Sequence, residues 1–334
     1  MKIVSYRKGL RGDLVEAWNR IFATRRNFVP MTRTSWRDRI EAASGQASFE
    51  SRLFRLAVDG ATVIGFVHGG FWENEFLATL APEQGSVAAQ TTCLGMLTMI
   101  AVVPERRRTG IGTALLESLR AEMGKLRDPA IVLRADGRVY NPYYGNFFAP
   151  APPPWGTTEG VSVLASDVAT RGFFSARGFH EAHTALSLVM DPRRLMSETP
   201  PIDDVERPLS CEIVEEDDYQ PILGSATGIA FSHENLSHTW VAVHGDVQVG
   251  TIIAYPLAAA GKPATRWAIY SLEVEPQYRG CGIARQLLWS ALRHLRALAI
   301  EEVETLVIPQ QSPAALRLYR SAGFREAEAW IVYK

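Results

Sequence analysis

Two short loops in this sequence combine arginine with closely spaced glycine residues, a pattern suited to binding phosphate groups. The first loop, RRTGIG, begins at Arg107, and the second, RGCGIA, begins at Arg279. In such loops small residues let backbone N–H groups approach a phosphate, and the N-terminus of the following helix adds partial positive charge. We therefore predict that each loop holds a pyrophosphate group. Both loops differ from the G-x-G-x-x-G and G-K-[ST] patterns of other phosphate-binding folds.

The predicted contacts of each loop run from its arginine to the first turn of the following helix. In the first loop they are Arg107, Arg108, Thr109, Gly110, Ile111 and Gly112, and in the second they are Arg279, Gly280, Cys281, Gly282, Ile283 and Ala284. Cys281 has two interpretations. It is either a thiol activated by the helix N-terminus or a small residue that fills a tight loop.

The elements that must position these loops occur twice in the same order. An apolar run ends at a proline before each loop, at Pro104 and at Pro276, and an amphipathic helical pattern follows the loop. A hairpin pattern precedes each of these units, the first with its turn at Asp59 and Gly60. In the second copy a helix is also predicted from Asp218 onward. The two copies lie about 170 residues apart, which is too long a period for a solenoid and indicates a duplicated domain.

We predict a mixed α/β (α+β) fold of two tandem domains, each a twisted, mostly antiparallel sheet flanked by helices. The N-terminal domain covers residues 1–195 and contains a long loop insert near residues 137–170, dense in proline, glycine and aromatic residues. A charged, proline-containing linker covers residues 196–208, and the C-terminal domain covers residues 209–334. Two fused copies can satisfy an interface internally, so we expect a monomer with pseudo-dimeric domain pairing.

The composition narrows the class of partner. The chain of 334 residues has a net charge of -1 and is 47% hydrophobic, so bulk electrostatics give no reason to expect nucleic acid or an anionic membrane. No run approaches the ~18 apolar residues of a membrane helix. The three cysteines lack paired spacing, and His233, His238 and His244 lack metal-like spacing. We expect a cytoplasmic protein that acts on a small molecule or peptide and binds no metal.

Each loop is followed downstream by an aromatic-x-x-x-G-F segment, and together these motifs resemble the GNAT (GCN5-related N-acetyltransferase) superfamily over nearly the whole chain. The resemblance implies that the R-x-x-G-x-[GA] loop holds the pyrophosphate of acetyl-CoA, the cosubstrate. It also implies direct attack by a primary amine through a tetrahedral intermediate. The implied oxyanion donor is a backbone N–H near Val274 and, in the other half, near Val102. The acceptor itself is not identified.

The resemblance further implies a tyrosine that protonates the leaving thiolate, and the two halves differ at that position. Tyr319 occupies it in the C-terminal half, whereas the N-terminal half has Phe174, which has no proton to donate. This contrast favours the C-terminal domain as the catalyst, and the alternative for Tyr319 is a core aromatic. The candidate bases are Glu273 and Glu275, which flank Val274; solvated strand charges and a water chain are the alternatives.

Three other interpretations stay open. The first is an enzyme active in the N-terminal half, which would bind the coenzyme at its GIG loop. The aromatic residues of the insert would then line the substrate pocket or donate the proton; alternatively, they form a packing flap. The aromatic residues are Tyr140, Tyr143, Tyr144, Phe147, Phe148 and Trp155. A non-catalytic acyl-CoA sensor or scaffold would bind the coenzyme without turnover. An acyltransferase with a longer acyl group or a hydroxyl acceptor would be revealed by a donor panel.

Overall fold

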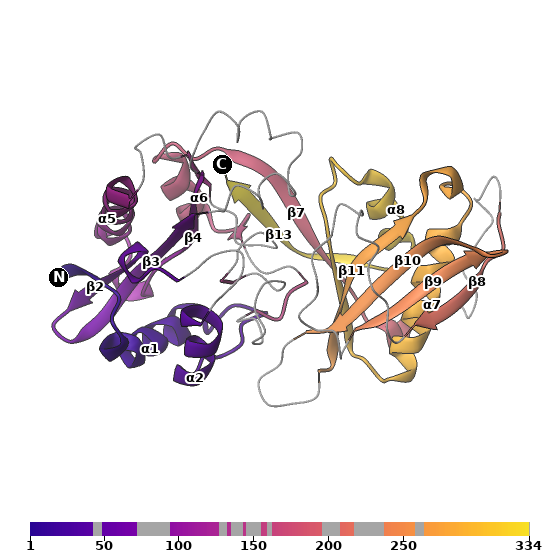
Figure 1. Cartoon of the computed structure of the whole chain (residues 1–334), viewed down its shortest axis with the longest axis horizontal. Coiled ribbons are helices and arrows are strands. Elements are labelled where there is room, and N and C mark those ends of the chain that lie inside the picture. Colours follow the sequence, from indigo (N-terminus) through magenta and orange to yellow (C-terminus); the bar gives the residue numbers. More distant parts are fainter. Residues whose placement is uncertain are drawn as a thin grey trace.

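The computed structural model describes residues 1–42, 49–71, 94–126, 132–134, 143–144, 155–158, 162–195, 208–216, 237–257 and 264–333. Within them the chain forms two sheets, one in each half of an elongated molecule (Figure 1). The helix predicted from Asp218 and nearly all of the predicted linker lie outside the described residues. No helix among the described residues is long and apolar enough to cross a membrane.

The first sheet has five strands in the order β1-β2-β3-β4-β5. They are β1 (Lys2–Ser5), β2 (Phe54–Asp59), β3 (Thr62–Phe71), β4 (Leu94–Val102) and β5 (Val132–Arg134). Neighbours are antiparallel except β4 and β5, which are parallel. The hairpin predicted at Asp59 and Gly60 is confirmed, since β2 and β3 pair across this turn and Gly60 has a φ of +62°.

Helices cover both faces of the first sheet (Figure 1). On one face lie α1 (Arg11–Phe22) and α2 (Arg33–Trp36), which continues as the π-helical turn Arg37–Glu41, and on the other lies α5 (Ile111–Leu126). α1 packs on the sheet because its buried residues share one side of the helix. Trp18 is the largest of them and stacks on Phe66 of β3, with ring centroids 5.6 Å apart. α6 (Val168–Ser175) follows near the junction of the halves.

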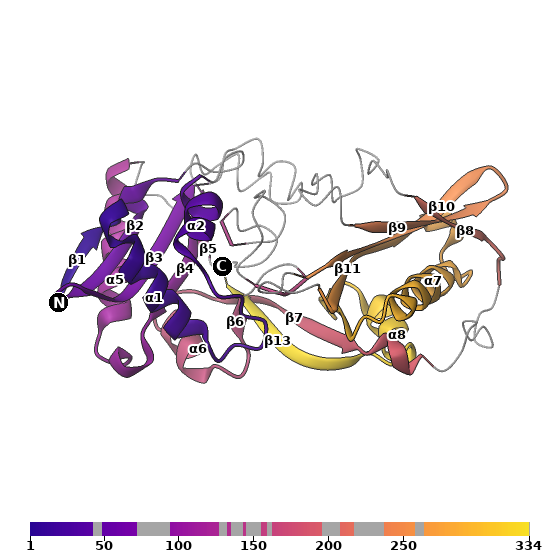
Figure 2. The same cartoon turned by 90° about the horizontal axis from the view of Figure 1, so that it is seen from below.

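The second sheet has eight strands in the order β6-β13-β7-β12-β11-β10-β9-β8. They are β6 (Val163–Leu164), β7 (Glu181–Met190), β8 (Glu212–Glu216), β9 (His238–His244), β10 (Val247–Pro256), β11 (Arg266–Val274), β12 (Glu302–Val307) and β13 (Arg325–Tyr333). Only β11 and β12 pair in parallel. α7 (Ile283–Ala297) and α8 (Pro313–Ser321) lie on the same side of this sheet (Figure 2). The predicted mixed α/β class with two tandem units is confirmed.

Short 3-10 turns link several of these elements. They are Lys8–Leu10, Ser51–Leu53, Pro104–Arg106, Pro192–Arg194 and Pro276–Tyr278. The turns at Pro104 and Pro276 stand at matching places, directly before the two glycine loops. The duplicated sequence therefore folds into a duplicated local structure.

Two strands cross between the halves. β7 belongs to the predicted N-terminal domain, residues 1–195, but lies between β12 and β13 in the second sheet. β13 runs back toward the first half, where Tyr333 stacks on Phe174 of α6 with ring centroids 4.9 Å apart. Figure 1 shows this long strand pair bridging the molecule. The division into residues 1–195 and 209–334 stays a prediction, and a shared sheet joins the halves in addition to the linker segment.

Candidate active site

The two arginines that open the loops make the same contact. The Nε of Arg107 donates a hydrogen bond to the carbonyl oxygen of Val102 at 3.0 Å, and the Nε of Arg279 donates to that of Val274 at 3.0 Å. Each guanidinium is thereby tied to the end of the strand that leads into its loop. The position of both arginines follows from the repeated spacing of arginine and strand.

The loop glycines adopt the left-handed conformation that their positions require. Gly110 has a φ of +84° and Gly282 a φ of +81°, directly before α5 and α7 begin. The halves differ two residues earlier, where Arg108 has a φ of +64° and Gly280 a φ of +78°. A non-glycine residue in this region is strained. The first loop therefore has a strained backbone at Arg108, the third of three consecutive arginines.

A bulge interrupts the strand before each loop at the same place. In β4 the register with β3 shifts between His68 and Gly69, which leaves Thr98 as the extra residue. In β11 the register with β10 shifts between Ile253 and Ala254, which leaves Tyr270 as the extra residue. Bulges bend a strand and are common beside active sites.

Beyond the bulge, no described strand pairs with β4 on the side of β5. The described pairing with β5 covers only Leu94 to Met96. The Val103 N–H donates to the Ile64 carbonyl at 3.0 Å, and in an antiparallel ladder this turns the Val102 N–H away from β3. The Val102 N–H thus points to the β5 side of β4.

A cavity of ≈ 930 Å³ opens against this edge of the first half. Its walls come from β4, the first loop, the start of α5, the end of α1 and α6, and they include Phe174. Glu328 and Trp330 of β13 close it from the second half of the sequence. The strand crossing therefore completes this cavity. The residues of the second loop, Arg279 to Ala284, are not among its lining residues.

Glu328 is the titratable carboxylate best placed to act as a base in the cavity. Its side chain is partly buried, and this burial raises its pKa, an effect that the cations Arg26 and Arg25 partly oppose. The amide of Asn27 donates a hydrogen bond to Glu328 Oε2 at 3.4 Å. The other acidic residue in the cavity, Asp167, accepts hydrogen bonds from Thr170 at the start of α6 and is therefore less free to act.

Tyr319, the acid predicted for the second half, lies in the core. It is 4% exposed, packs edge-on against Phe324 and is hydrogen-bonded to the Thr305 side chain. Burial raises its pKa to about 12. These surroundings match the core-aromatic alternative. A catalytic role for Tyr319 stays a prediction that these contacts do not support.

The predicted bases Glu273 and Glu275 are both exposed. Glu273 accepts a hydrogen bond from the Ser271 hydroxyl at 3.1 Å, and Glu275 stands at the start of the turn before the second loop. Cys281 in that loop is partly buried, and its carbonyl accepts a hydrogen bond from the Leu209 N–H at 3.1 Å. The structure does not bring these residues into the cavity described above.

The described aromatic residues of the insert pack into the first core. Tyr143 and Tyr144 are 1% and 0% exposed, and the Tyr144 hydroxyl lies 2.9 Å from Nδ1 of His68. Trp155 lines the cavity and packs edge-on against Phe22. Tyr140, Phe147 and Phe148 lie outside the described residues. The insert thus supplies both packing and one wall of the cavity. Glu328 is the residue that motif reasoning missed, because no loop motif marks it.

Comparison with known proteins agrees with the duplicated fold. A family model described as the acetyltransferase (GNAT) family matches residues 13–142 and 202–324. A mycothiol acetyltransferase of Thermobispora bispora is 35% identical over 66 residues, 20% of this chain and 22% of that enzyme. The N-alpha-acetyltransferase RimI of Mycobacterium tuberculosis is 36% identical over 78 residues, 23% of this chain and 47% of that enzyme. The matched segments therefore span less than half of each of these relatives.

A solved structure shares the two-domain arrangement. It is a tandem GNAT protein from the clavulanic acid biosynthesis pathway, with a TM-score of 0.62 and 16% sequence identity. The superposition covers 99% of this chain and 97% of that chain. At this level of identity the likeness concerns the fold alone.

Proposed function

Because the chain belongs to the acetyltransferase (GNAT) family, we propose that it transfers an acetyl group from acetyl-CoA to a primary amine and that the first half is catalytic. The family and the acyltransferase class predicted from the sequence are confirmed, since the family model matches both halves. The choice of half rests on the ≈ 930 Å³ cavity, whose lining residues include the first loop, the end of β4 and Glu328. It departs from the preference for the second half that Tyr319 suggested.

The residues around the first loop fit a pyrophosphate. Arg106, Arg107 and Arg108 all line the cavity, and α5 begins there with the unpaired N–H groups of its first turn. The space also suits a coenzyme, because ligand sites are typically about 300–1,000 Å³. These arginines and the residues Gly110 to Gly112 would hold acetyl-CoA. When bound, acetyl-CoA supplies an activated thioester.

Glu328 is proposed as the general base that removes a proton from the attacking amine. Its raised pKa makes it a stronger base than an ordinary glutamate, and the hydrogen bond from Asn27 orients it. The Val102 N–H is proposed as a donor to the oxyanion, since it points away from β3 and Val102 lines the cavity. Phe174 cannot protonate the leaving thiolate. We propose that the proton which Glu328 takes from the amine passes to this thiolate, directly or through water.

The proposed acceptor is a primary amine of a small molecule or peptide. The carboxylates of Glu328 and Asp167 lie in the wall of the cavity and favour an ammonium group over an anion at that end. Arg25 forms an ion pair with Asp167, and Arg26 forms one with Glu302, so two of the nearby cations already have carboxylate partners. We propose that the chain works as a monomer, because its own strand β13 completes the cavity.

An assay of coenzyme A release tests this function. The full-length protein is incubated with acetyl-CoA and a panel of primary amines, and acetylated products are identified by mass. Amine-dependent acetyl transfer is the expected result. Saturable coenzyme binding without transfer to any acceptor would support the sensor alternative instead. Preferential use of longer acyl-CoA donors or hydroxyl acceptors would contradict the proposed donor or acceptor.

A further inference from the structure

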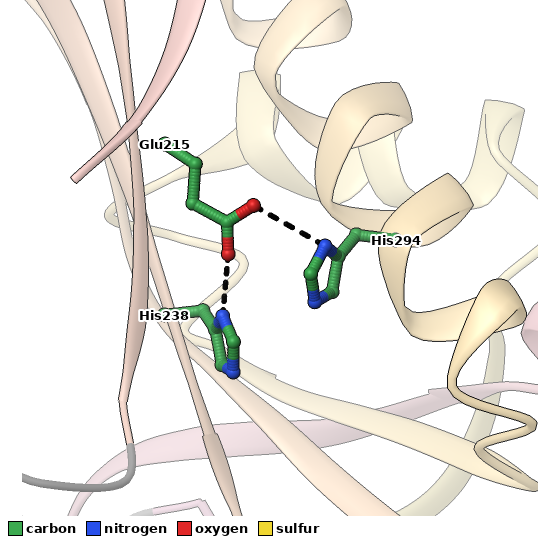
Figure 3. Close-up of side chains that lie close together, drawn as sticks. All are labelled: Glu215, His238 and His294. Carbon is green, nitrogen blue, oxygen red and sulfur yellow. Dashed lines mark hydrogen bonds and ion pairs between the residues drawn. The ribbon is translucent and has the colours of Figure 1, made fainter. Parts of the chain in front are cut away.

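Two imidazoles and a carboxylate lie close together in the second half (Figure 3), and none of the three side chains lines the cavity. Glu215 lies on β8, His238 on β9 and His294 on α7. Each offers an atom that can bind a metal, and these atoms all lie within 4.8 Å of one another. The sequence-based expectation of no metal considered the spacing of histidines along one segment. Such spacing carries no information about side chains that three separate elements bring together.

The Glu215 carboxylate stands between the two imidazole rings. Its Oε1 lies 2.5 Å from Nδ1 of His238, and its Oε2 lies 3.3 Å from Nδ1 of His294. Figure 3 shows both Nδ1 atoms facing the carboxylate. With metal bonds of about 2.0–2.1 Å, tetrahedral ligand atoms stand about 3.3 Å apart. Small side-chain movements would therefore suffice to place an ion among these three groups.

The surroundings hold the rings in place and leave one side accessible. The Trp240 and His294 ring centroids are 5.4 Å apart, and those of His238 and Trp267 are 5.3 Å apart. The side chains of His238, Glu215 and His294 are 31%, 33% and 28% exposed, so a fourth ligand such as water can approach.

The hydrogen bonds within the cluster do not use all of its polar atoms. Nε2 of His294 is buried and has no hydrogen-bond partner among the described residues. A shallow depression beside the cluster is lined by Glu215, His294 and Arg293 among others. The Arg293 guanidinium donates a hydrogen bond to the Ser290 hydroxyl at 3.3 Å rather than pairing with Glu215. Within the described part of the chain, the Glu215 carboxylate thus pairs with the two histidines.

We propose that Glu215, His238 and His294 bind one divalent transition-metal ion of the zinc class. Two imidazoles and one carboxylate form the ligand set of an open zinc site, in which a fourth position stays available. The bound ion ties the edge strand β8 to β9 and to α7. Its binding stabilises the second half independently of acetyl transfer, and it weakens at low pH because the imidazoles must be unprotonated.

Calorimetric titration of Zn²⁺ into the full-length protein, purified with a chelator and then dialysed, tests the site. One Zn²⁺ per chain is expected. His238→Asn and His294→Asn should each weaken binding at least about ten-fold, since replacing even the outer partners of metal ligands costs that much. His244→Asn is the matched control, because His244 lies at the other end of the same strand. Absence of Zn²⁺ binding, or equal binding by all variants, would overturn the proposal.

A second measurement separates this site from a thiol site in the same half. Burial raises the pKa of Cys211, and nearby Cys281 adds to the shift, so these two thiols are a competing pair of soft ligands. Titration with Co²⁺ distinguishes them by absorption spectrum. Tetrahedral ligand-field bands that persist in Cys281→Ser and vanish in His294→Asn support the proposal. Thiolate-to-cobalt charge-transfer bands that vanish in Cys281→Ser would contradict it.

Discussion

The two halves of this molecule share one loop geometry and differ in what surrounds it. Arg107 and Arg279 make the same bond to the preceding strand, and Gly110 and Gly282 have nearly the same φ. Beside the first loop lies a ≈ 930 Å³ cavity, whereas the described residues of the second loop contribute nothing to it. A phosphate-binding motif is therefore not enough to identify the catalytic half.

The second half contributes to the first through a strand. β13 carries Glu328 and Trp330 into the cavity wall, and β7 takes the reciprocal place between β12 and β13. After duplication, such an exchange lets one copy supply side chains to the site of the other. The following substitutions test the proposed division of labour between the two halves.

Replacing the proposed base should have the largest effect. Glu328→Gln keeps the shape and the bond to Asn27 but cannot accept a proton, so kcat should fall by about 10²–10⁴. Steady-state kinetics with a saturating amine measure it. Glu326→Gln is the control, because Glu326 is an exposed residue two positions earlier that pairs with Arg320. If Glu273→Gln or Glu275→Gln caused the larger loss, the second loop would be the active one.

The pH profile should report the same carboxylate. Glu328 acts in its ionised form, so the rate is expected to fall as pH drops below its pKa, by about ten-fold per pH unit. Burial raises that pKa, so the fall should begin above the usual range of a glutamic acid. Glu328→Gln should abolish this acidic limb while Glu326→Gln keeps it. An unchanged limb in Glu328→Gln would assign the proton transfer to another group.

Tyr319→Phe should have the smallest effect on turnover. Because Tyr319 is buried and bonded to Thr305, its hydroxyl is expected to contribute to stability rather than to chemistry. We expect a kcat change below about two-fold and a free energy of unfolding lower by about 1 kcal/mol, the usual worth of one hydrogen bond. Denaturant unfolding and kinetics measure the two effects. A hundred-fold loss of kcat with unchanged stability would restore Tyr319 as the acid.

Sequence patterns predicted the features that depend on local chemistry. The proline, arginine and glycine offsets indicated two equivalent loops, and the structure gives these loops matching conformations because backbone geometry follows local residue types. The hairpin at Gly60 was predicted for the same reason.

The features that depend on long-range pairing were not predicted. The residues of β13 predict a strand but not its partners, so they could not reveal that Glu328 reaches the first cavity. Tyr319 sits in a motif, yet its burial depends on how α8 packs against β12. Likewise, His294 and Glu215 carry no spacing signal, because a helix and a strand bring them together only in the folded chain.

The most direct test of the first half as the coenzyme site is calorimetric titration of acetyl-CoA into wild type, Gly110→Glu and Gly282→Glu. The two substitutions place the same bulk and negative charge at matched left-handed positions, so they strain the two loops alike. Wild type and Gly282→Glu should bind acetyl-CoA, and Gly110→Glu should not. Loss of binding only in Gly282→Glu would place the coenzyme site in the second half instead.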